Sequence, residues 1–496
     1  MISNPYTYLH TYLPKWISNK AIMFYVAALL LVTGIYFRYS LPWYYMLSGV
    51  ASVCLFFYLG NKLSRTWGAD KVRSEKRFEK KIFWTSFALR LGWVLLIYTI
   101  FQNYWGDAFG FENMDATFYD SAGQDFADGW RNGNLIGAWN QALKYSDISD
   151  LGYAAYLGLV YALTDNSILA ARVLKCVWSA LTVILMYRLA KRNFGEDTGR
   201  LTAIFCMFWP NFWYYCGAHL KETEMVFLAV LFVEQADQML RTRNFSVWKL
   251  IPVLLISAAL FSVRTPLALV TVLCLLFSVV MSSTRVVGWG KRIIIGLLAL
   301  ALIGVTMGNA IQEQAKDLAS QVRSGQQQRN MEWRTQREDG NKFAKYAGMA
   351  VFAPMIFTIP FPTMVDTHSE QHVQQLLNGG NFVKNILSFF VIFAMFTLLF
   401  SGRWREYLVP LSYMLGYLVV LALSNFAQSE RFHQPAMPME LMFAAYGIQQ
   451  ALMGVPIAKG IGSRTTYKRW FMMWLGVMFV ACVAWNWFKL AGRGLV

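Results

Sequence analysis

Apolar stretches close to twenty residues long recur along the whole chain, separated by short polar segments. An α-helix rises about 1.5 Å per residue, so about 20 apolar residues cross the roughly 30 Å hydrocarbon core of a bilayer. Closed membrane barrels are excluded, because they read as alternating strands of about ten residues. We therefore expect an all-α integral membrane protein, a polytopic bundle of about 13 transmembrane helices. The spans lie near residues 21–38, 42–60, 83–101, 167–189, 199–216, 224–240, 247–262, 266–283, 293–309, 381–400, 407–424, 437–453 and 471–489.

One apolar stretch, residues 346–365, is interrupted by Pro354, Pro360 and Pro362. Proline removes a backbone donor and breaks a helix, so we expect a re-entrant or surface-lying element here instead of a span. The whole pattern divides the chain into four parts. These are an N-terminal hairpin with a basic loop (1–82), a transmembrane module with an acidic loop at 102–166 (83–309), a long external loop (310–380) and C-terminal helices (381–496).

The formal net charge is +17, and 56% of the residues are hydrophobic. Lysine and arginine gather in short loops between apolar runs, most densely at 61–81, and such loops face the cytoplasm. The charge thus reports topology and gives no reason to expect a nucleic-acid partner. This orientation places the N-terminus in the cytoplasm and the loop 102–166 outside, with external amphipathic helices.

The six cysteines are Cys54, Cys176, Cys206, Cys216, Cys274 and Cys482. They are scattered through apolar segments without metal-site spacing or a disulfide framework, so we interpret them as small buried hydrophobes. No cleavable signal peptide is evident, because the first apolar run leads straight into a second.

Four polar clusters are predicted to lie on the external face. They are the acidic stretch 111–130, the turn 216–225, the turn around Arg264 and the segment 424–448. Ionisable groups at a membrane edge are costly and usually functional. Carboxylates suit proton abstraction from an alcohol or metal binding, and arginine suits phosphate. Together they predict an acceptor hydroxyl meeting a phosphate-linked donor.

The order of these motifs resembles the GT-C membrane glycosyltransferases, in particular the protein-mannosyltransferase-like group, which take sugars from polyprenyl-phosphate carriers. Members carry an external acidic motif, a helix starting with Ala-Ala-Arg, an acidic residue in an external turn, an R-x-P-like turn and a late E-R-[YF]-x-x-P-like motif. The matching positions are Asp115, Tyr119, Ala122 and Gly129, then 170–172, Glu222, Arg264 to Pro266, and 430–438. The resemblance covers roughly residues 85–450, and the chain departs from it by the extra hairpin 21–60.

The resemblance implies a role for each matched residue. Asp115 would be the catalytic base, and Glu222 would support the site or help to hold a divalent cation, Mg²⁺ or Mn²⁺. Arg264 and Arg431 would clamp the donor phosphate, and transfer would invert the anomeric centre. Possible supporting residues are Tyr119, Glu112, Asp107, His219, Lys221, Glu430 and His433, with Asp107 the main rival for the base. The amphipathic pattern places Asp120, Asp125 and Asp128 on a solvated helix face.

The expected activity is transfer of a sugar from a polyprenyl-phosphate-linked donor to a lipid, glycan or protein acceptor, without an organic cofactor. The expected location is a bacterial inner membrane, with the active site facing the periplasm. Two alternatives stay open. A glycan polymerase or ligase would rely on arginines more than on an acidic loop. A lipid-linked glycan flippase or transporter would show inverted repeats and midplane charges.

Overall fold

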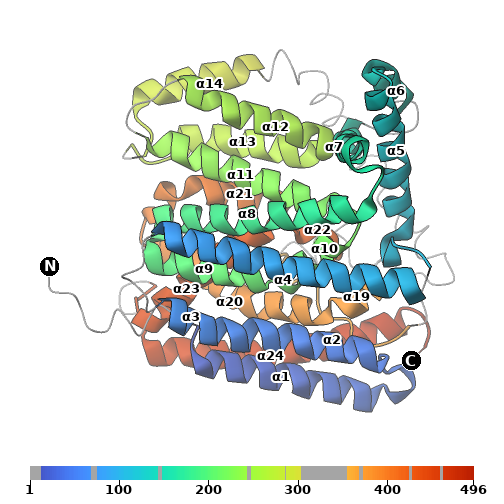
Figure 1. Ribbon diagram of the computed structural model, residues 1–496. Helices are drawn as coiled ribbons and strands as arrows, with labels where there is room; N and C mark the ends of the chain where they lie inside the picture. The colour runs from blue at the N-terminus through green and yellow to red at the C-terminus, as the bar shows by residue number, and fades with distance from the viewer. Residues whose placement is uncertain are drawn as a thin grey trace. The chain divides into compact units, whose positions relative to one another are not determined.

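A computed structural model describes the protein as a set of helices (Figure 1). The described residues are 13–68, 75–104, 106–142, 148–242, 247–284, 286–302, 355–367, 372–423, 427–457 and 462–495. The chain divides into two compact units, Asp70–Leu275, here the central unit, and Met1–Ala69 with Leu276–Val496, here the terminal unit. Within the described ranges, β pairing is limited to one isolated bridge between Ser40 and Val365. The prediction of a polytopic all-α membrane protein is confirmed.

Six helical stretches of the described chain are long and apolar enough to cross a membrane. Shorter apolar helices accompany them, at Leu250–Val263, Thr265–Met281 and Leu408–Ala422. Every predicted span overlaps helix in its described part, and residues 303–309 and 424 lie outside the described residues. The count of 13 spans stays a prediction, as does the four-part division. The six are Lys15–Ile35, Trp43–Trp67, Glu75–Tyr104, Ile168–Phe194, Asn378–Phe400 and Arg464–Ala491.

The central unit packs long helices side by side, and one helix of the acidic loop, α5, runs across their direction (Figure 1). α8 lies against α4, α9 and α11, and α12 lies against α11 and α7. The bounds are α4 (Glu75–Tyr104), η4 (Gly110–Glu112), α5 (Asn113–Arg131), α6 (Leu135–Ala142), α7 (Ile148–Thr164), α8 (Ile168–Phe194), α9 (Glu196–Phe208), α10 (Pro210–Gly217), α11 (Glu222–Arg241), η5 (Val247–Lys249), α12 (Leu250–Val263) and α13 (Thr265–Met281).

The apolar run predicted as one span at 199–216 is two helices. α9 ends at Phe208, Trp209 is extended with ψ 114°, and Pro210 starts α10. Proline pushes the residue before it out of the helical region and is well tolerated as the first residue of a helix, so the break falls at this dipeptide. The break gives the chain a short helix, α10, that leads into the turn before α11.

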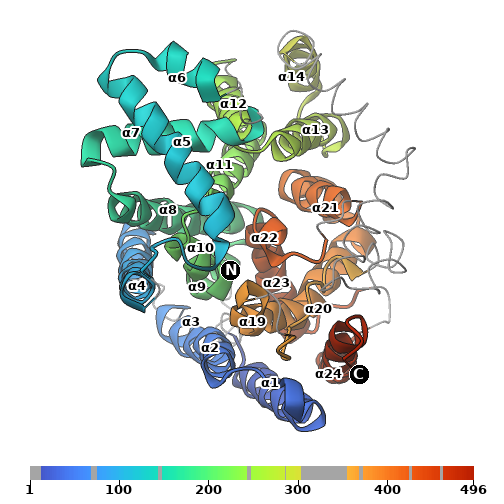
Figure 2. The ribbon, with the colours of Figure 1, turned by 90° about the vertical axis from the view of Figure 1, so that its right-hand side faces the viewer.

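The helices of the acidic loop pack through glycines. α5 lies against α7 (Figure 2), and a Cβ on Gly158 of α7 would come within 2.4 Å of Phe126 Cβ. A Cβ on Gly123 of α5 would come within 2.9 Å of Leu157 Cβ. The two backbones therefore approach more closely than any larger residue at these positions allows.

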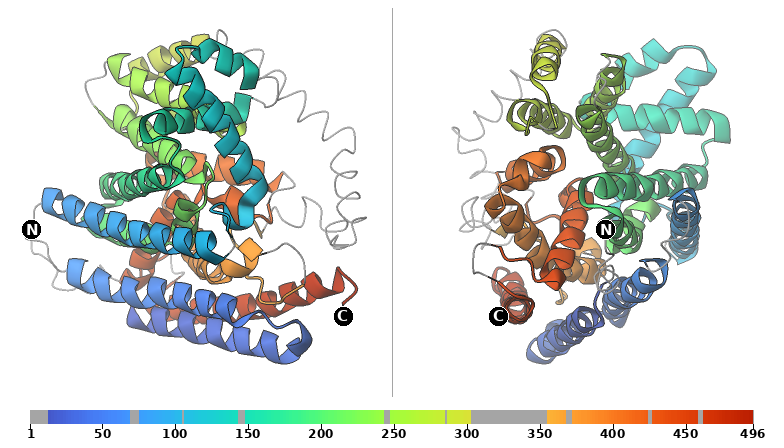
Figure 3. Two further views of the ribbon diagram at one scale, coloured as in Figure 1. Left: turned by 45° about the vertical axis from the view of Figure 1, so that its right-hand side comes forward. Right: turned by 90° about the vertical axis from the view of Figure 1, so that its left-hand side faces the viewer.

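The terminal unit joins both ends of the chain, with α1 lying against both α2 and α24 in the described part (Figure 3). α1 and α24 run parallel, because Trp16 meets Phe471 at 5.5 Å between ring centroids and Phe24 meets Phe479 at 6.1 Å. The bounds are α1 (Lys15–Ile35), η2 (Phe37–Tyr39), α2 (Trp43–Cys54), η3 (Leu55–Leu59), α3 (Gly60–Gly68), α14 (Trp289–Leu302), α19 (His372–Leu376), α20 (Asn378–Phe400), η8 (Arg403–Glu406), α21 (Leu408–Ala422), α22 (Glu430–His433), α23 (Met437–Met453) and α24 (Arg464–Ala491).

Residues 355–367 form an irregular and mostly buried segment, whose only helical part is a short turn at 355–358. Side chains from α20 and α24 satisfy its backbone: Lys384 donates to Ile359 O at 2.7 Å, and Asn486 donates to Pro362 O at 3.1 Å. Irregular backbone is tolerated at membrane depth where protein groups satisfy it. The described part is therefore not a spanning helix and is mostly buried in the protein. Residues 346–354 lie outside the described residues, and the re-entrant path stays a prediction.

Candidate active site

Three of the four predicted polar clusters meet at one end of the central unit. Lys221, in the turn between α10 and α11, donates to Val263 O at 2.7 Å and to Ser149 O at 3.2 Å. Thr265 N donates to Ser149 Oγ at 3.3 Å. Because Arg264 lies between Val263 and Thr265, these bonds join the acidic-loop helices, the 218–221 turn and the Arg264 turn. The fourth cluster belongs to the terminal unit and is described separately below.

Lys175 of α8 holds the turn between α10 and α11 through hydrogen bonds to its backbone. Its ammonium donates to Ala218 O at 2.7 Å, to Tyr215 O at 3.4 Å and to Leu220 O. A cation is favoured where helix carbonyls are left unpaired, as at the end of α10. Glu224 Oε2 lies 3.8 Å from the same ammonium. The residues of this turn are thus buried in the protein, and its position on the external face stays a prediction.

His219 in this turn is fully buried and belongs to a chain of polar groups. Tyr161 donates to Asp120 Oδ1, and its oxygen lies 3.1 Å from His219 Nε2. Burial, with the nearby charges of Lys175 and Arg172, holds the pKa of His219 well below its usual value, so the ring is neutral. The Tyr161 hydroxyl donates its one proton in the hydrogen bond to the Asp120 carboxylate, which can only accept. The His219 ring must therefore donate from Nε2 to the Tyr161 oxygen.

Asp120 corrects one prediction from the sequence. The sequence placed it on a solvated helix face, yet it is only 8% exposed. Its carboxylate accepts hydrogen bonds from the Tyr161 hydroxyl and, at 2.8 Å, from Gln124 Nε2. The signal for burial was present, because Asp120 is four residues after Ala116 and three before Gly123, on the stripe that packs against α7. The other two members of the predicted face are exposed as expected: Asp125, and Asp128, which pairs with Arg131 at 3.3 Å.

The acidic motif that begins with Asp115 and Tyr119 contains one exposed acid and one buried tyrosine. Asp115, in the first turn of α5, is exposed. Tyr119, one turn later, is 4% exposed, donates to Asp150 Oδ1 at 3.0 Å and packs edge-on against Tyr153. Its ring also lies 5.8 Å from the Lys221 ammonium. Tyr119 therefore ties α5 to α7 and to the 218–221 turn, and this fixes the helix that carries Asp115.

Asp107, the rival for the base, lies half-buried in the segment between α4 and α5, where its Oδ1 accepts from Phe109 N at 2.8 Å. Arg172, the arginine of the Ala-Ala-Arg helix start, is buried and donates to Ala108 O. The arginine of that motif therefore holds the segment that carries Asp107, a role that the sequence did not reveal. Glu112 ends η4, and its side chain lies outside the described residues.

Glu222 and Arg264 occupy helix boundaries. Glu222 is the first residue of α11 and is 2% exposed. Arg264 is half-buried and extended between α12 and α13, with its N–H bonded to Leu260 O at 2.7 Å and its carbonyl accepting from Leu267 N at 3.1 Å. The backbone of Arg264 thus bonds to the end of α12 and to the start of α13, and these bonds fix the Cα position from which its side chain extends.

The E-R-F-H motif forms the short helix α22 of the terminal unit. Glu430 and His433 are buried, and Arg431 is half-buried. His433 Nδ1 lies 2.6 Å from Lys384 Nζ, and Nε2 lies 2.8 Å from Ala427 O. Burial and the charge of Lys384 lower the pKa of His433 well below its usual value. The neutral ring accepts from Lys384 and donates to Ala427, which anchors the turn that presents Arg431.

Metal binding stays a prediction. In the described ranges, no group of three His, Cys, Asp or Glu side chains is placed to hold an ion. All six cysteines are described and are free thiols, five of them buried, as the sequence predicted.

The apolar helices and the polar turns at one end of the central unit define a multi-pass membrane protein with a candidate catalytic site. Residues 151–307 match the family model described as dolichyl-phosphate-mannose-protein mannosyltransferase, a family of GT-C type. The match confirms the resemblance to the GT-C superfamily and indicates a membrane glycosyltransferase of that type. No curated protein and no solved structure shows a significant match.

The matched segment begins in α7 and contains the 218–221 turn, Glu222 and Arg264. Asp115 lies before it and Arg431 lies after it. Their roles therefore rest on the motifs and on the geometry given above.

Proposed function

We propose that this protein transfers a sugar from a polyprenyl-phosphate-linked donor to a hydroxyl group of a lipid, glycan or protein acceptor. The observation that carries the proposal is the joining of the acidic-loop helices, the 218–221 turn and the Arg264 turn by Lys221 and Ser149. The proposed location is the periplasmic face of a bacterial inner membrane. Basic residues in short loops support this orientation.

Asp115 is the proposed base. Its exposure on the first turn of α5 leaves it accessible to an acceptor, whereas the Asp120 side chain is buried. Asp115 takes the proton of the acceptor hydroxyl while that oxygen attacks the anomeric carbon. The bond from the anomeric carbon to the phosphate oxygen breaks, and polyprenyl phosphate leaves as an anion. Attack opposite the leaving group inverts the anomeric centre.

Arg264 and Arg431 are the proposed phosphate ligands. A leaving phosphate needs charge stabilisation more than protonation, and guanidinium groups supply it through charge-assisted hydrogen bonds. Arg264 starts from a backbone fixed between two helices, and Arg431 from the anchored α22. Glu222, at the buried start of α11, supports the site, and Mg²⁺ or Mn²⁺ would add positive charge near the phosphate. Titration with EDTA, followed by Mn²⁺ addition, tests the metal.

The test is sugar transfer by the full chain in lipid nanodiscs, with polyprenyl-phosphate sugars as donors and extracted envelope lipids and glycans as acceptors. Asp115→Asn is expected to reduce the transfer rate by about 10²–10⁴, the range for loss of a general base. Asp125→Asn is the matched control, because Asp125 is an exposed aspartate on the same helix. Equal rates for Asp115→Asn and wild type would contradict the assignment of the base.

Two further outcomes distinguish an error in the identity of the base from an error in the proposed reaction. Loss of transfer in Asp107→Asn, with Asp115→Asn active, would move the base to Asp107 and leave the transferase proposal intact. Movement of a lipid-linked glycan across the bilayer, without transfer of sugar from any donor tested, would contradict the transferase proposal itself.

A further inference from the structure

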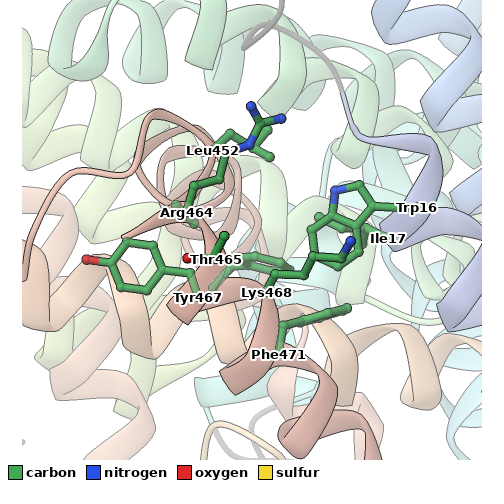
Figure 4. A pocket seen from close by; sticks show the side chains of 10 residues that line it. Trp16, Ile17, Leu452, Arg464, Thr465, Tyr467, Lys468 and Phe471 are labelled. Carbon is green, nitrogen blue, oxygen red and sulfur yellow. The ribbon is translucent and has the colours of Figure 1, made fainter. Parts of the chain in front are cut away.

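A pocket of the terminal unit lies where α1 and α24 begin and α23 ends (Figure 4). Its cavity volume is about 290 Å³. Its apolar lining includes Trp16, Ile17, Phe390 and Phe471, which come from α1, α20 and α24. The parallel packing of α1 and α24 brings the first turns of both helices to this one place.

Two cations, Arg464 and Lys468, also line this pocket. Both side chains are exposed, and they are four residues apart, on one face of α24. The Lys468 ammonium lies 5.5 Å from the centroid of the Trp16 ring. The sequence stretches that build the pocket, 13–20, 387–393, 450–457 and 462–471, contain no aspartate or glutamate. These stretches therefore leave the two charges without a carboxylate to neutralise them.

The position of the pocket sets the polarity of a matching ligand. α1 and α24 are both candidate membrane spans, so their first turns lie where hydrocarbon meets the polar headgroups. Tryptophan and basic residues are typical of that level. Basic pockets between transmembrane helices bind anionic lipid headgroups. A fitting ligand is anionic at one end and apolar at the other.

We propose that this pocket binds an anionic phospholipid of the surrounding membrane. Arg464 and Lys468 hold its phosphate, and the aromatic and aliphatic walls receive the first carbons of its acyl chains. The start of α24 adds favourable partial charge, because Ser463 Oγ accepts only one of the first N–H groups, that of Thr466, at 3.3 Å.

This site is separate from the proposed donor-phosphate residue of the same unit. Arg431 precedes the start of α23, whereas Leu452, which lines the pocket, lies in its last turn. The 17 residues of α23 span about 25 Å along the helix axis. The proposal therefore does not depend on the glycosyltransferase reaction.

The test is native mass spectrometry of the full chain released from detergent that contains either phosphatidylglycerol or phosphatidylcholine. Wild type is expected to retain phosphatidylglycerol in preference to phosphatidylcholine. The double variant Arg464→Gln, Lys468→Gln is expected to lose roughly 30-fold in apparent affinity for phosphatidylglycerol, from two lost charges. Arg469→Gln is the matched control, because Arg469 is exposed on the same turn of α24 but does not line the pocket.

A third variant separates the pocket from general surface charge. Thr465→Phe narrows the pocket and keeps both cations, so retention of phosphatidylglycerol should also fall. Equal retention of the two lipids by wild type would overturn the proposal, as would equal losses in Arg469→Gln and the double variant. So would unchanged retention in Thr465→Phe, or displacement of the lipid by millimolar inorganic phosphate. Unshifted melting temperatures would show that the variants are folded.

Discussion

The ammonium of Lys221 is 1% exposed and forms an ion pair with Asp150, whose side chain is 35% exposed. The two residues tie the 218–221 turn to the start of α7. The pair is asymmetric, because water reaches the carboxylate but not the ammonium. Loss of Asp150 would therefore leave a buried ammonium that water cannot solvate.

We expect Asp150→Ala to destabilise the protein by about 3 kcal/mol, because it leaves a buried ammonium without its counter-charge. Asp128→Ala is the comparison, because the side chains of its pair with Arg131 are 67% and 36% exposed, so its loss should cost about 1 kcal/mol or less. Thermal unfolding of both variants in the same detergent at one scan rate measures the difference. Equal shifts in melting temperature would mean that water reaches the Lys221 ammonium as readily as it reaches Arg131.

A second prediction concerns the contact between α5 and α7. Gly158→Ala should destabilise the protein by about 1–3 kcal/mol, because the added Cβ would come within 2.4 Å of Phe126 Cβ and 3.1 Å of Ala127 N. Gly92→Ala is the control: Gly92 is also helical, and its added Cβ would meet nothing within 4 Å. That control should be neutral or slightly stabilising, because alanine favours helix by about 1 kcal/mol over glycine. Melting temperatures, with limited proteolysis of the acidic loop, would show the contrast.

Hydrophobic length predicted the helices well, because an apolar run must satisfy its backbone internally wherever lipid surrounds it. It failed at Trp209–Pro210, where most of the run is buried and hydropathy carries no signal for the break. The proline itself was the available signal. Prolines also indicated that the segment 355–367 would not form a continuous helix, and this segment is irregular in the structure.

The candidate site was predictable in part. The common sidedness of the acidic loop, the 218–221 turn and Arg264 came from counting spans, and Lys221 joins all three. The roles of Arg172 and Lys175 were hidden, because each contacts backbone carbonyls far away in the sequence. A buried cation on an apolar helix indicates some partner, but sequence alone does not identify a carbonyl as that partner.

A third prediction follows from the buried histidine of the 218–221 turn. The folded-state pKa of His219 is lowered by burial and by Lys175 and Arg172, whereas an unfolded histidine titrates near about 6.5. As the pH falls below about 6.5, the unfolded chain binds a proton that the folded chain does not. Stability should therefore be full above this pH and decline below it, by up to about 1.4 kcal/mol per pH unit per histidine.

His433 has the same sign, so removing one histidine should flatten the slope only in part. His219→Gln should lower the slope of melting temperature between pH 7 and 5. Tyr161→Phe, which removes a hydroxyl but leaves His219 in place, should lower stability at every pH and keep the slope. A His219→Gln slope identical to that of wild type would show that His219 already binds a proton in the folded state.

The last prediction separates the phosphate arginines from structural ones. Arg264→Ala and Arg431→Ala should each raise the KM for the lipid-linked donor by about 10- to 100-fold, since a hydrogen bond to a charged group contributes about 1.5–3 kcal/mol. Lysine at either position keeps the charge but loses the two-pronged geometry, so the loss should be smaller but measurable. Arg405→Ala is the control, because Arg405 is exposed and packs on Trp404. Initial rates against donor concentration, at saturating acceptor, give the comparison. A fall in kcat with an unchanged KM would mean that the arginine acts in the transition state alone, and unchanged rates in both variants would remove the two arginines from the site.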